Sequence, residues 1–151
     1  MELILWRHAE AEDGWPDMAR ALTPKGHKQA EKMAAWLTSR LPPDTRILVS
    51  PALRTQQTAA ALNMKFSTHE EIAPGAEAEA LLQAANWPGD ATNVLIVGHQ
   101  PTLGAVAAMV LAGQQNASWS VKKGALWWIS GRTRDDYTST VLRAVMSPDL
   151  L

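Results

Sequence analysis

Basic side chains that can bind a phosphoryl group follow three short apolar runs of the sequence. Arg7 and His8 end the first run. Arg54 comes shortly after the second run, and His99 ends the third. Guanidinium groups present fork-shaped, permanently charged donors, and they favour the neutral imidazole that can attack phosphorus. These residues predict a phosphoryl-transfer site with His8 as nucleophile, although two buried structural histidines are the alternative.

Other kinds of site are excluded or disfavoured. The chain has no cysteine, which excludes thiol catalysis, thiolate metal sites and disulfides. Glu10, Glu12 and Asp13 follow His8, but carboxylates there would compete with phosphate for the arginines, and their spacing matches no hard-cation loop. We therefore predict no metal ligand and place these acids in a solvated loop at the rim of the site.

Composition narrows the class of protein. The 151 residues, 46% of them hydrophobic, suit one compact domain, residues 1–151. The 14 basic and 15 acidic residues are interspersed and give a formal charge of -1, so we expect neither a nucleic-acid nor a membrane partner. The apolar opening resembles a buried strand more than a signal peptide, and no run approaches membrane-spanning length. We expect a cytoplasmic protein.

The elements that must position these side chains alternate along the chain. Short apolar runs predict four central strands, at Leu3–Trp6, Ile47–Val49, Val94–Val97 and Leu126–Ile129. Lys65–Thr68 is a further candidate strand, and Thr138–Val145 is expected to add a final strand. Thr23-Pro24 and Ser50-Pro51 each combine an N-cap with a proline at the first helical position. The helices expected from apolar spacing cover about 24–41, 51–62, 77–86 and 103–113. This alternation predicts an α/β fold, a three-layer α/β/α sandwich with a mostly parallel sheet.

Tryptophan is unusually abundant, with seven residues beside one Phe and one Tyr. Three of them, Trp15, Trp87 and Trp119, fall near predicted loops, and the others fall in predicted strands or a helix. We expect packing in the core or at its edge rather than an aromatic binding surface.

At these positions the chain resembles the histidine phosphatase superfamily, which includes cofactor-dependent phosphoglycerate mutases. The matching blocks occur in order: Arg7-His8-Ala9, Leu22-Thr23-Pro24-Lys25-Gly26 with Gln29-Ala30, Ser50-Pro51 with Arg54 and Gln57-Thr58, and Val97-Gly98-His99-Gln100-Pro101. The short length, the Arg20–Thr23 segment and the closing Met146-Ser147-Pro148 are most similar to the small phosphohistidine phosphatases of the SixA type.

This resemblance implies a phosphoglycerate mutase-like fold and hydrolysis of phosphohistidine without cofactor or metal. His8 would become transiently phosphorylated, while Arg7, Arg54 and His99 hold the phosphoryl group. The implied partner is a phosphorylated protein side chain, such as that of a histidine phosphotransfer domain, or a small phosphorylated molecule.

Two departures from the family pattern leave questions open. Ala9 replaces the usual glycine, which is tolerated if the backbone needs no positive φ. The chain is too short for the inserted segment that supplies a general acid in larger members, and Glu71 is our first candidate because Glu71-Ile72-Ala73-Pro74 resembles a stretch of the small members. A solvated loop carboxylate is the alternative for Glu71.

Other functions remain open from the sequence alone. They are a general small-molecule phosphomonoesterase, a mutase-like phosphotransferase, and a non-catalytic phosphate-binding domain. A mutase must also hold the carboxylate of its substrate and exclude water from the phosphoenzyme, and the chain looks too short for the residues that this requires. Retention of both arginines and both histidines argues against a non-catalytic domain.

Overall fold

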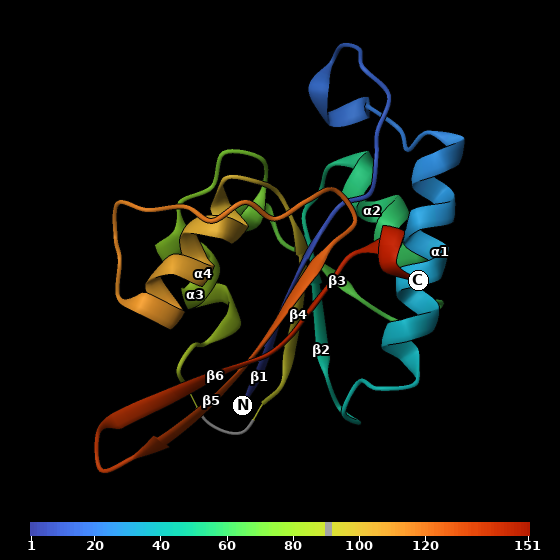
Figure 1. The fold of residues 1–151 in the computed structure, drawn as a ribbon. Helices are drawn as coiled ribbons and strands as arrows, with labels where there is room; N and C mark the ends of the chain where they lie inside the picture. The colour runs from blue at the N-terminus through green and yellow to red at the C-terminus, as the bar shows by residue number, and fades with distance from the viewer. Residues whose placement is uncertain (90–91) are drawn as a thin grey trace.

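A central sheet lies between two layers of helices in the computed structural model, which describes residues 1–89 and 92–151 (Figure 1). The six strands are β1 (Glu2–Arg7), β2 (Arg46–Val49), β3 (Ser67–Thr68), β4 (Val94–Gly98), β5 (Leu126–Arg134) and β6 (Tyr137–Met146). Their order in the sheet is β3-β2-β4-β1-β5-β6. All six predicted strands are present, with β3 shorter and β5 longer than expected.

The sheet is parallel on one side and antiparallel on the other. Neighbouring strands among β3, β2, β4 and β1 are parallel, whereas β5 runs antiparallel to β1 and β6 antiparallel to β5. The prediction of a mostly parallel sheet is therefore only partly matched. The antiparallel pairing of β5 with β6 follows from the two-residue connection Asp135-Asp136, in which both residues have a positive φ. Such a turn makes a hairpin, whereas a parallel neighbour needs a long crossover.

The four helices complete the predicted three-layer sandwich. They are α1 (Pro24–Thr38), α2 (Leu53–Ala60), α3 (Ala78–Ala85) and α4 (Thr102–Ala112). The first two cover one face of the sheet and the last two cover the other, and each pair encloses its own buried apolar cluster (Figure 1). Within residues 1–89 and 92–151, no helix is both long and apolar enough to cross a bilayer.

The start of α1 agrees with the sequence signal. The Thr23 hydroxyl accepts a hydrogen bond from the Gly26 N–H at 2.9 Å, and Pro24 occupies the first turn. Gly26 also allows a close backbone approach, because a Cβ there would lie 2.0 Å from the Glu10 carbonyl oxygen. The first turn of α1 is thus packed directly against the segment that follows β1.

The start of α2 differs from the prediction. We expected Ser50-Pro51 to begin the helix, but α2 begins at Leu53 and its N-cap is Ala52. The Ser50 N–H instead donates to the Val97 carbonyl oxygen and extends the sheet by one residue. Ser50 is therefore held at the strand end, and its hydroxyl is available to a neighbouring side chain.

The expectation for the tryptophans is wrong at one position. Trp15 is 91% exposed in the loop between β1 and α1. By contrast, Trp6 is fully buried and donates from Nε1 to the Gly124 carbonyl oxygen at 2.9 Å. Trp119 stacks on Trp127 with ring centroids 5.2 Å apart. The loop that contains Trp15 protrudes from the body of the molecule (Figure 1).

Candidate active site

The carboxyl ends of β1, β2 and β4 lie side by side. Arg7 on β1 is in register with Gly98 on β4, and the next residue, His8, donates its N–H to the Gly98 carbonyl oxygen at 3.1 Å. Ser50 makes the equivalent bond from β2 to Val97 at 3.1 Å. Ligands of open α/β sheets bind at such strand ends. The fold therefore brings the predicted site residues of three separate chain segments to one edge.

The ring of His8 is buried and held in one tautomer. Its Nδ1 lies 2.7 Å from the Ala9 carbonyl oxygen, which can only accept, so Nδ1 carries the proton. Burial, followed by the charges of Arg54 and Arg7, lowers the pKa of His8 to about 4, although the bond to Ala9 opposes the shift. The ring is therefore neutral at pH 7, and Nε2 carries the free lone pair that a nucleophile requires.

Two arginines supply positive charge beside this ring. Arg7 donates from Nη1 to the Val121 carbonyl oxygen at 2.9 Å. Burial, then the neighbouring charge of Arg54, lowers the pKa of Arg7. Among the described residues, the Nε atoms of Arg7 and Arg54 are buried and have no hydrogen-bond partner. Buried donors of this kind suit an anionic ligand with several oxygens, which would also relieve the repulsion between the two guanidinium groups.

His99 lies next to His8, with ring centroids 5.4 Å apart. Burial, then the nearby His8 and Arg54, lowers the pKa of His99 to about 3, so this ring is also neutral at pH 7. Its Nε2 lies 2.6 Å from the Ser50 hydroxyl, which accepts at 3.4 Å from the Ala52 N–H. The Ser50 hydroxyl can donate to Nε2, and this arrangement places the proton of the neutral ring on Nδ1. The Nδ1 atom is buried and has no hydrogen-bond partner among the described residues.

We define the floor of the site as Arg7, His8, Arg54 and His99. Three of these side chains, His8, Arg54 and His99, are among the few buried polar groups of the described chain. The floor joins two charged forks, one N–H donor and one unprotonated ring nitrogen. This combination can hold the equatorial oxygens of a phosphoryl group and attack its phosphorus.

Sequence reasoning missed Asp17, which contacts the floor from the loop before α1. Arg54 donates from Nη1 to the Asp17 carbonyl oxygen at 2.8 Å and from Nη2 to its Oδ2 at 3.1 Å. Asp17 belongs to a short 3-10 helix, η1 (Asp17–Ala19). The sequence contained one relevant signal, which is the group of acidic residues that follows His8. Their positions along the chain do not reveal which carboxylate contacts Arg54.

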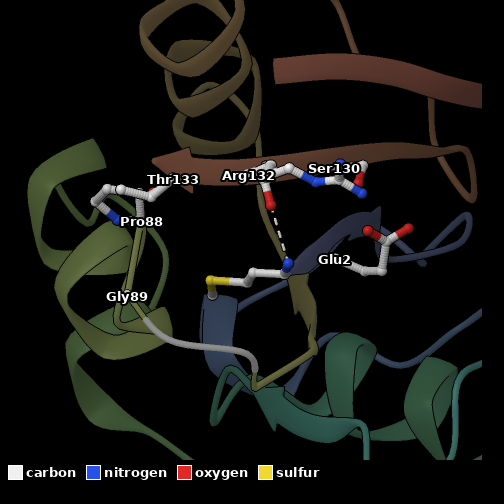
Figure 2. A pocket seen from close by; sticks show the side chains of 8 residues that line it. Glu2, Pro88, Gly89, Ser130, Arg132 and Thr133 are labelled. Atoms are coloured by element: carbon white, nitrogen blue, oxygen red, sulfur yellow. Dashed lines mark hydrogen bonds between the residues drawn. The ribbon is translucent and has the colours of Figure 1, made fainter. Parts of the chain in front are cut away.

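A separate hollow lies away from the floor. A cavity of about 620 Å³ opens at the amino end of β1, where the Met1 amino group donates to the Gly131 carbonyl oxygen at 2.9 Å. Figure 2 shows Glu2, Pro88 and Thr133 around it. None of the four floor residues lines this cavity. Volume alone does not identify the reactive site, because His8 and the two arginines lie toward the opposite ends of the strands.

Known proteins share these features of sequence. The family model for the histidine phosphatase superfamily (branch 1) matches residues 3–75. The phosphohistidine phosphatase SixA of Escherichia coli is 33% identical over 124 residues, which are 76% of this chain and 76% of that protein. The SixA homolog of Haemophilus influenzae is 35% identical over 77% of this chain and 80% of its own. The chain belongs to the histidine phosphatase superfamily.

Solved structures of histidine phosphatases have the same fold as this chain. A SixA structure complexed with tungstate superposes with a TM-score of 0.77 at 28% identity and covers 99% of both chains. A structure described as a SixA phosphatase from Nakamurella multipartitia has a TM-score of 0.81 at 27% identity, over 97% of this chain and 95% of that one. The three-layer fold predicted from the sequence is therefore confirmed.

Further family-motif residues of this histidine phosphatase support the floor. The Thr58 hydroxyl accepts from the Ala9 N–H at 3.0 Å and donates to the Arg54 carbonyl oxygen at 2.7 Å. The amides of Gln29 and Gln57 accept from main-chain N–H groups of the segment between β1 and α1. These contacts hold the chain after His8 against α1 and α2.

The alanine that departs from the family pattern fits the backbone. Ala9 is fully buried and has no positive φ. A Cβ is therefore compatible with this position, as the sequence analysis anticipated.

Glu71, the candidate acid, lies in another 3-10 helix, η2 (Glu70–Ile72). Its Oε1 accepts from His69 Nδ1 at 3.0 Å. Hydrogen bonds from its own backbone N–H and then from His69 lower the pKa of this carboxyl. The structure gives Glu71 a partner in its own loop and brings together the other four predicted residues.

Proposed function

We propose that this histidine phosphatase hydrolyses phosphohistidine and that His8 Nε2 is the nucleophile. The single observation that carries the proposal is the hydrogen bond from His8 Nδ1 to the Ala9 carbonyl oxygen, because it leaves Nε2 unprotonated beside two arginines. The lowered pKa of His8 supports the same role, since the neutral ring persists well below pH 7.

The reaction has two displacement steps. In the first, the Nε2 lone pair of His8 forms a bond to phosphorus while the bond from phosphorus to the leaving group breaks, and its electron pair goes to the leaving group. In the second, water attacks the phosphorylated His8, releasing phosphate and a proton and returning the bond pair to Nε2. Arg7 and Arg54 hold the phosphoryl oxygens, and His99 Nδ1–H donates to the charge that grows on them.

The SixA relatives support phosphohistidine as the substrate class, because two of them are phosphohistidine phosphatases or homologs by name and match across about three quarters of this chain. We propose that the physiological substrate is a phosphorylated protein side chain, such as that of a histidine phosphotransfer domain. A site at the carboxyl ends of β1, β2 and β4 suits a side chain that projects from another protein.

Glu71 enters the proposal as a candidate acid for the leaving group. Its lowered pKa means that it is ionised near pH 7 and carries little proton to donate. We therefore expect Glu71→Gln to leave turnover nearly unchanged. A large loss in this variant would restore Glu71 as the acid.

The decisive experiment measures phosphate release and phosphoenzyme formation with a phosphohistidine-bearing protein. His8→Ala is compared with wild type and with His27→Ala, which removes an exposed histidine of α1. We expect an acid-labile phosphoenzyme in wild type and His27→Ala, and none in His8→Ala. Equal turnover by His8→Ala and wild type would disprove the nucleophile. Phosphate binding without phosphoenzyme or phosphate release in wild type would instead indicate a non-catalytic binding domain.

A further inference from the structure

Asp17 lies at the mouth of the site, with one edge on the floor and the other in solvent. The side chain of Arg54 is 5% exposed, whereas that of Asp17 is 45% exposed. Asp17 Oδ2 accepts from Arg54 Nη2, and its Oδ1 accepts from Arg20 Nη1, each at 3.1 Å. The carboxylate is therefore held by two arginines between the buried floor and solvent.

The fixed carboxylate is a negative charge beside a site built for an anion. The hydrogen bond from Arg20, followed by that from Arg54, holds the pKa of Asp17 below its usual range. Its charge also acts on His99, whose pKa it raises against the larger effect of burial. Asp17 thus opposes any substrate group that gains negative charge at the mouth, and attracts any group that carries positive charge there.

This charge distinguishes two kinds of leaving group. A phosphomonoester expels an oxygen that becomes more negative as its bond to phosphorus breaks, and an ionised carboxylate has no proton to give it. Phosphohistidine can carry a proton on the ring nitrogen that is not bonded to phosphorus. When His8 Nε2 attacks this form, the electron pair of the breaking bond goes to the substrate ring, which leaves as neutral imidazole without any further proton transfer.

We propose that Asp17 is a specificity-determining residue that accepts a hydrogen bond from the protonated leaving imidazole and selects phosphohistidine over phosphomonoesters. The inference rests on the proposed function. In the transition state the leaving ring still carries the proton on its other nitrogen, together with part of the positive charge. A substrate with a neutral ring has neither. A carboxylate aligned with that N–H therefore raises kcat/KM for this leaving group.

A purely structural role for Asp17 predicts a different result. If Asp17 only holds Arg54 in place, its removal weakens the grip on every phosphoryl group equally. If Asp17 contacts the leaving ring, its removal lowers kcat/KM only for substrates whose leaving group is an imidazole. The comparison must therefore use substrates that share the phosphoryl group and differ in the leaving group.

The test compares Asp17→Asn with wild type and with Asp13→Asn. The first variant keeps the main-chain contact to Arg54 and nearly the same shape. The control makes the same chemical change at an exposed position of the same loop. kcat/KM is measured at pH 7.5 with a phosphohistidine protein, with phosphoimidazole and with p-nitrophenyl phosphate. Phosphoimidazole keeps the leaving ring but lacks a protein surface, and p-nitrophenolate leaves without a proton.

We expect Asp17→Asn to lose about 10- to 100-fold on both imidazole substrates, the worth of one charge-assisted hydrogen bond, with p-nitrophenyl phosphate unchanged or faster. Asp13→Asn should change each value by less than about twofold. An equal loss on all three substrates, or no loss on the imidazole substrates, would overturn the role of Asp17 while the proposed function stands. Failure of wild type to release phosphate from either imidazole substrate would overturn the proposed function and this inference with it.

Discussion

The floor of the site lies in the buried interior, whereas the loop that reaches it lies largely in solvent. We call residues 12–21 of this loop the mouth loop. The floor is fixed by main-chain bonds between strand ends, such as that from His8 to Gly98. The mouth loop is closed at its base by the hydrogen bond from the Glu12 N–H to the Ala21 carbonyl oxygen at 2.7 Å, and Figure 1 shows it in blue beyond the carboxyl ends of the strands. Arg54 links the two regions through its paired bonds to Asp17.

This difference indicates how the chain divides its tasks. The floor residues come from strand ends and a helix start that the core holds rigidly, and in the proposed reaction they act on phosphorus. The mouth loop can vary without disturbing the core, and in our proposal it selects the leaving group. Changes in the floor should therefore reduce turnover of all substrates, and changes in the mouth loop should alter preference.

The largest expected effect comes from exchanging one cation for another in the floor. Arg54→Lys keeps the charge but loses the fork that holds both the phosphoryl group and Asp17. We expect kcat/KM to fall by about 10²- to 10³-fold on every substrate. Arg20→Lys, which changes the other arginine that contacts Asp17, should cost less than about fivefold. Steady-state kinetics on p-nitrophenyl phosphate measures both, and similar losses in the two variants would erase the distinction between floor and mouth.

The sequence was sufficient for the floor because its residues follow strands that apolar runs mark clearly. Arg7, His8 and His99 end those runs, and parallel strands must present such ends at one edge. Arg54 could be placed because it falls in the first turn of the following helix. Local pattern and topology point to the same site, so no detail of side-chain packing was needed.

Three features could not be predicted from local pattern. Asp17 reaches Arg54 across 37 positions of sequence, and only the folded loop decides which acid makes that contact. Ser50 matches a helix start but bonds to His99 because the sheet continues through it. The Asp135-Asp136 hairpin makes β6 antiparallel to β5, an outcome that depends on two positive φ angles rather than on apolar spacing.

A second prediction uses pH to separate the floor from the mouth. Folding lowers the pKa of His8 from 6.5 to about 4 and that of His99 to about 3. Between pH 6.5 and 4 the unfolded chain therefore binds more protons, and the free energy of unfolding falls as the solution is acidified. The lowered pKa of Asp17 gives a dependence of the same sign, but its contribution is lost only as the pH falls below the ordinary value of 3.8, outside this window.

The measurement is urea unfolding at pH 7.5 and pH 5.0. Wild type should lose about 2 kcal/mol for each of the two histidines over this interval. His8→Gln should show a dependence smaller by about that amount, because it removes one of the two groups. Asp17→Asn should keep the wild-type dependence in this window. A His8→Gln protein that matched wild type at both pH values would show that the ring titrates normally in the folded state.

A third prediction concerns Ser50, which supports the floor without belonging to it. Ser50→Ala removes the hydroxyl that fixes His99 Nε2, so the ring can place its proton on either nitrogen. We expect about a tenfold loss in kcat/KM, smaller than the loss for Arg54→Lys because the ring itself remains. Ser50→Thr, which keeps a hydroxyl, should recover most of the activity. Equal activity of Ser50→Ala and wild type would mean that His99 needs no fixed tautomer.

The smallest effect is expected at Trp15, the most exposed large side chain of the mouth loop. At 91% exposure it loses almost no contact with water on folding, so Trp15→Ala should change the free energy of unfolding by less than about 0.5 kcal/mol. Trp119→Ala is the matched control, because it removes a ring that stacks on Trp127, and should cost about 1–2 kcal/mol. Urea unfolding at pH 7.5 measures both. A loss in Trp15→Ala as large as that in the control would show that the mouth loop packs against the body of the molecule, and the separation between a rigid floor and an independent loop would then fail.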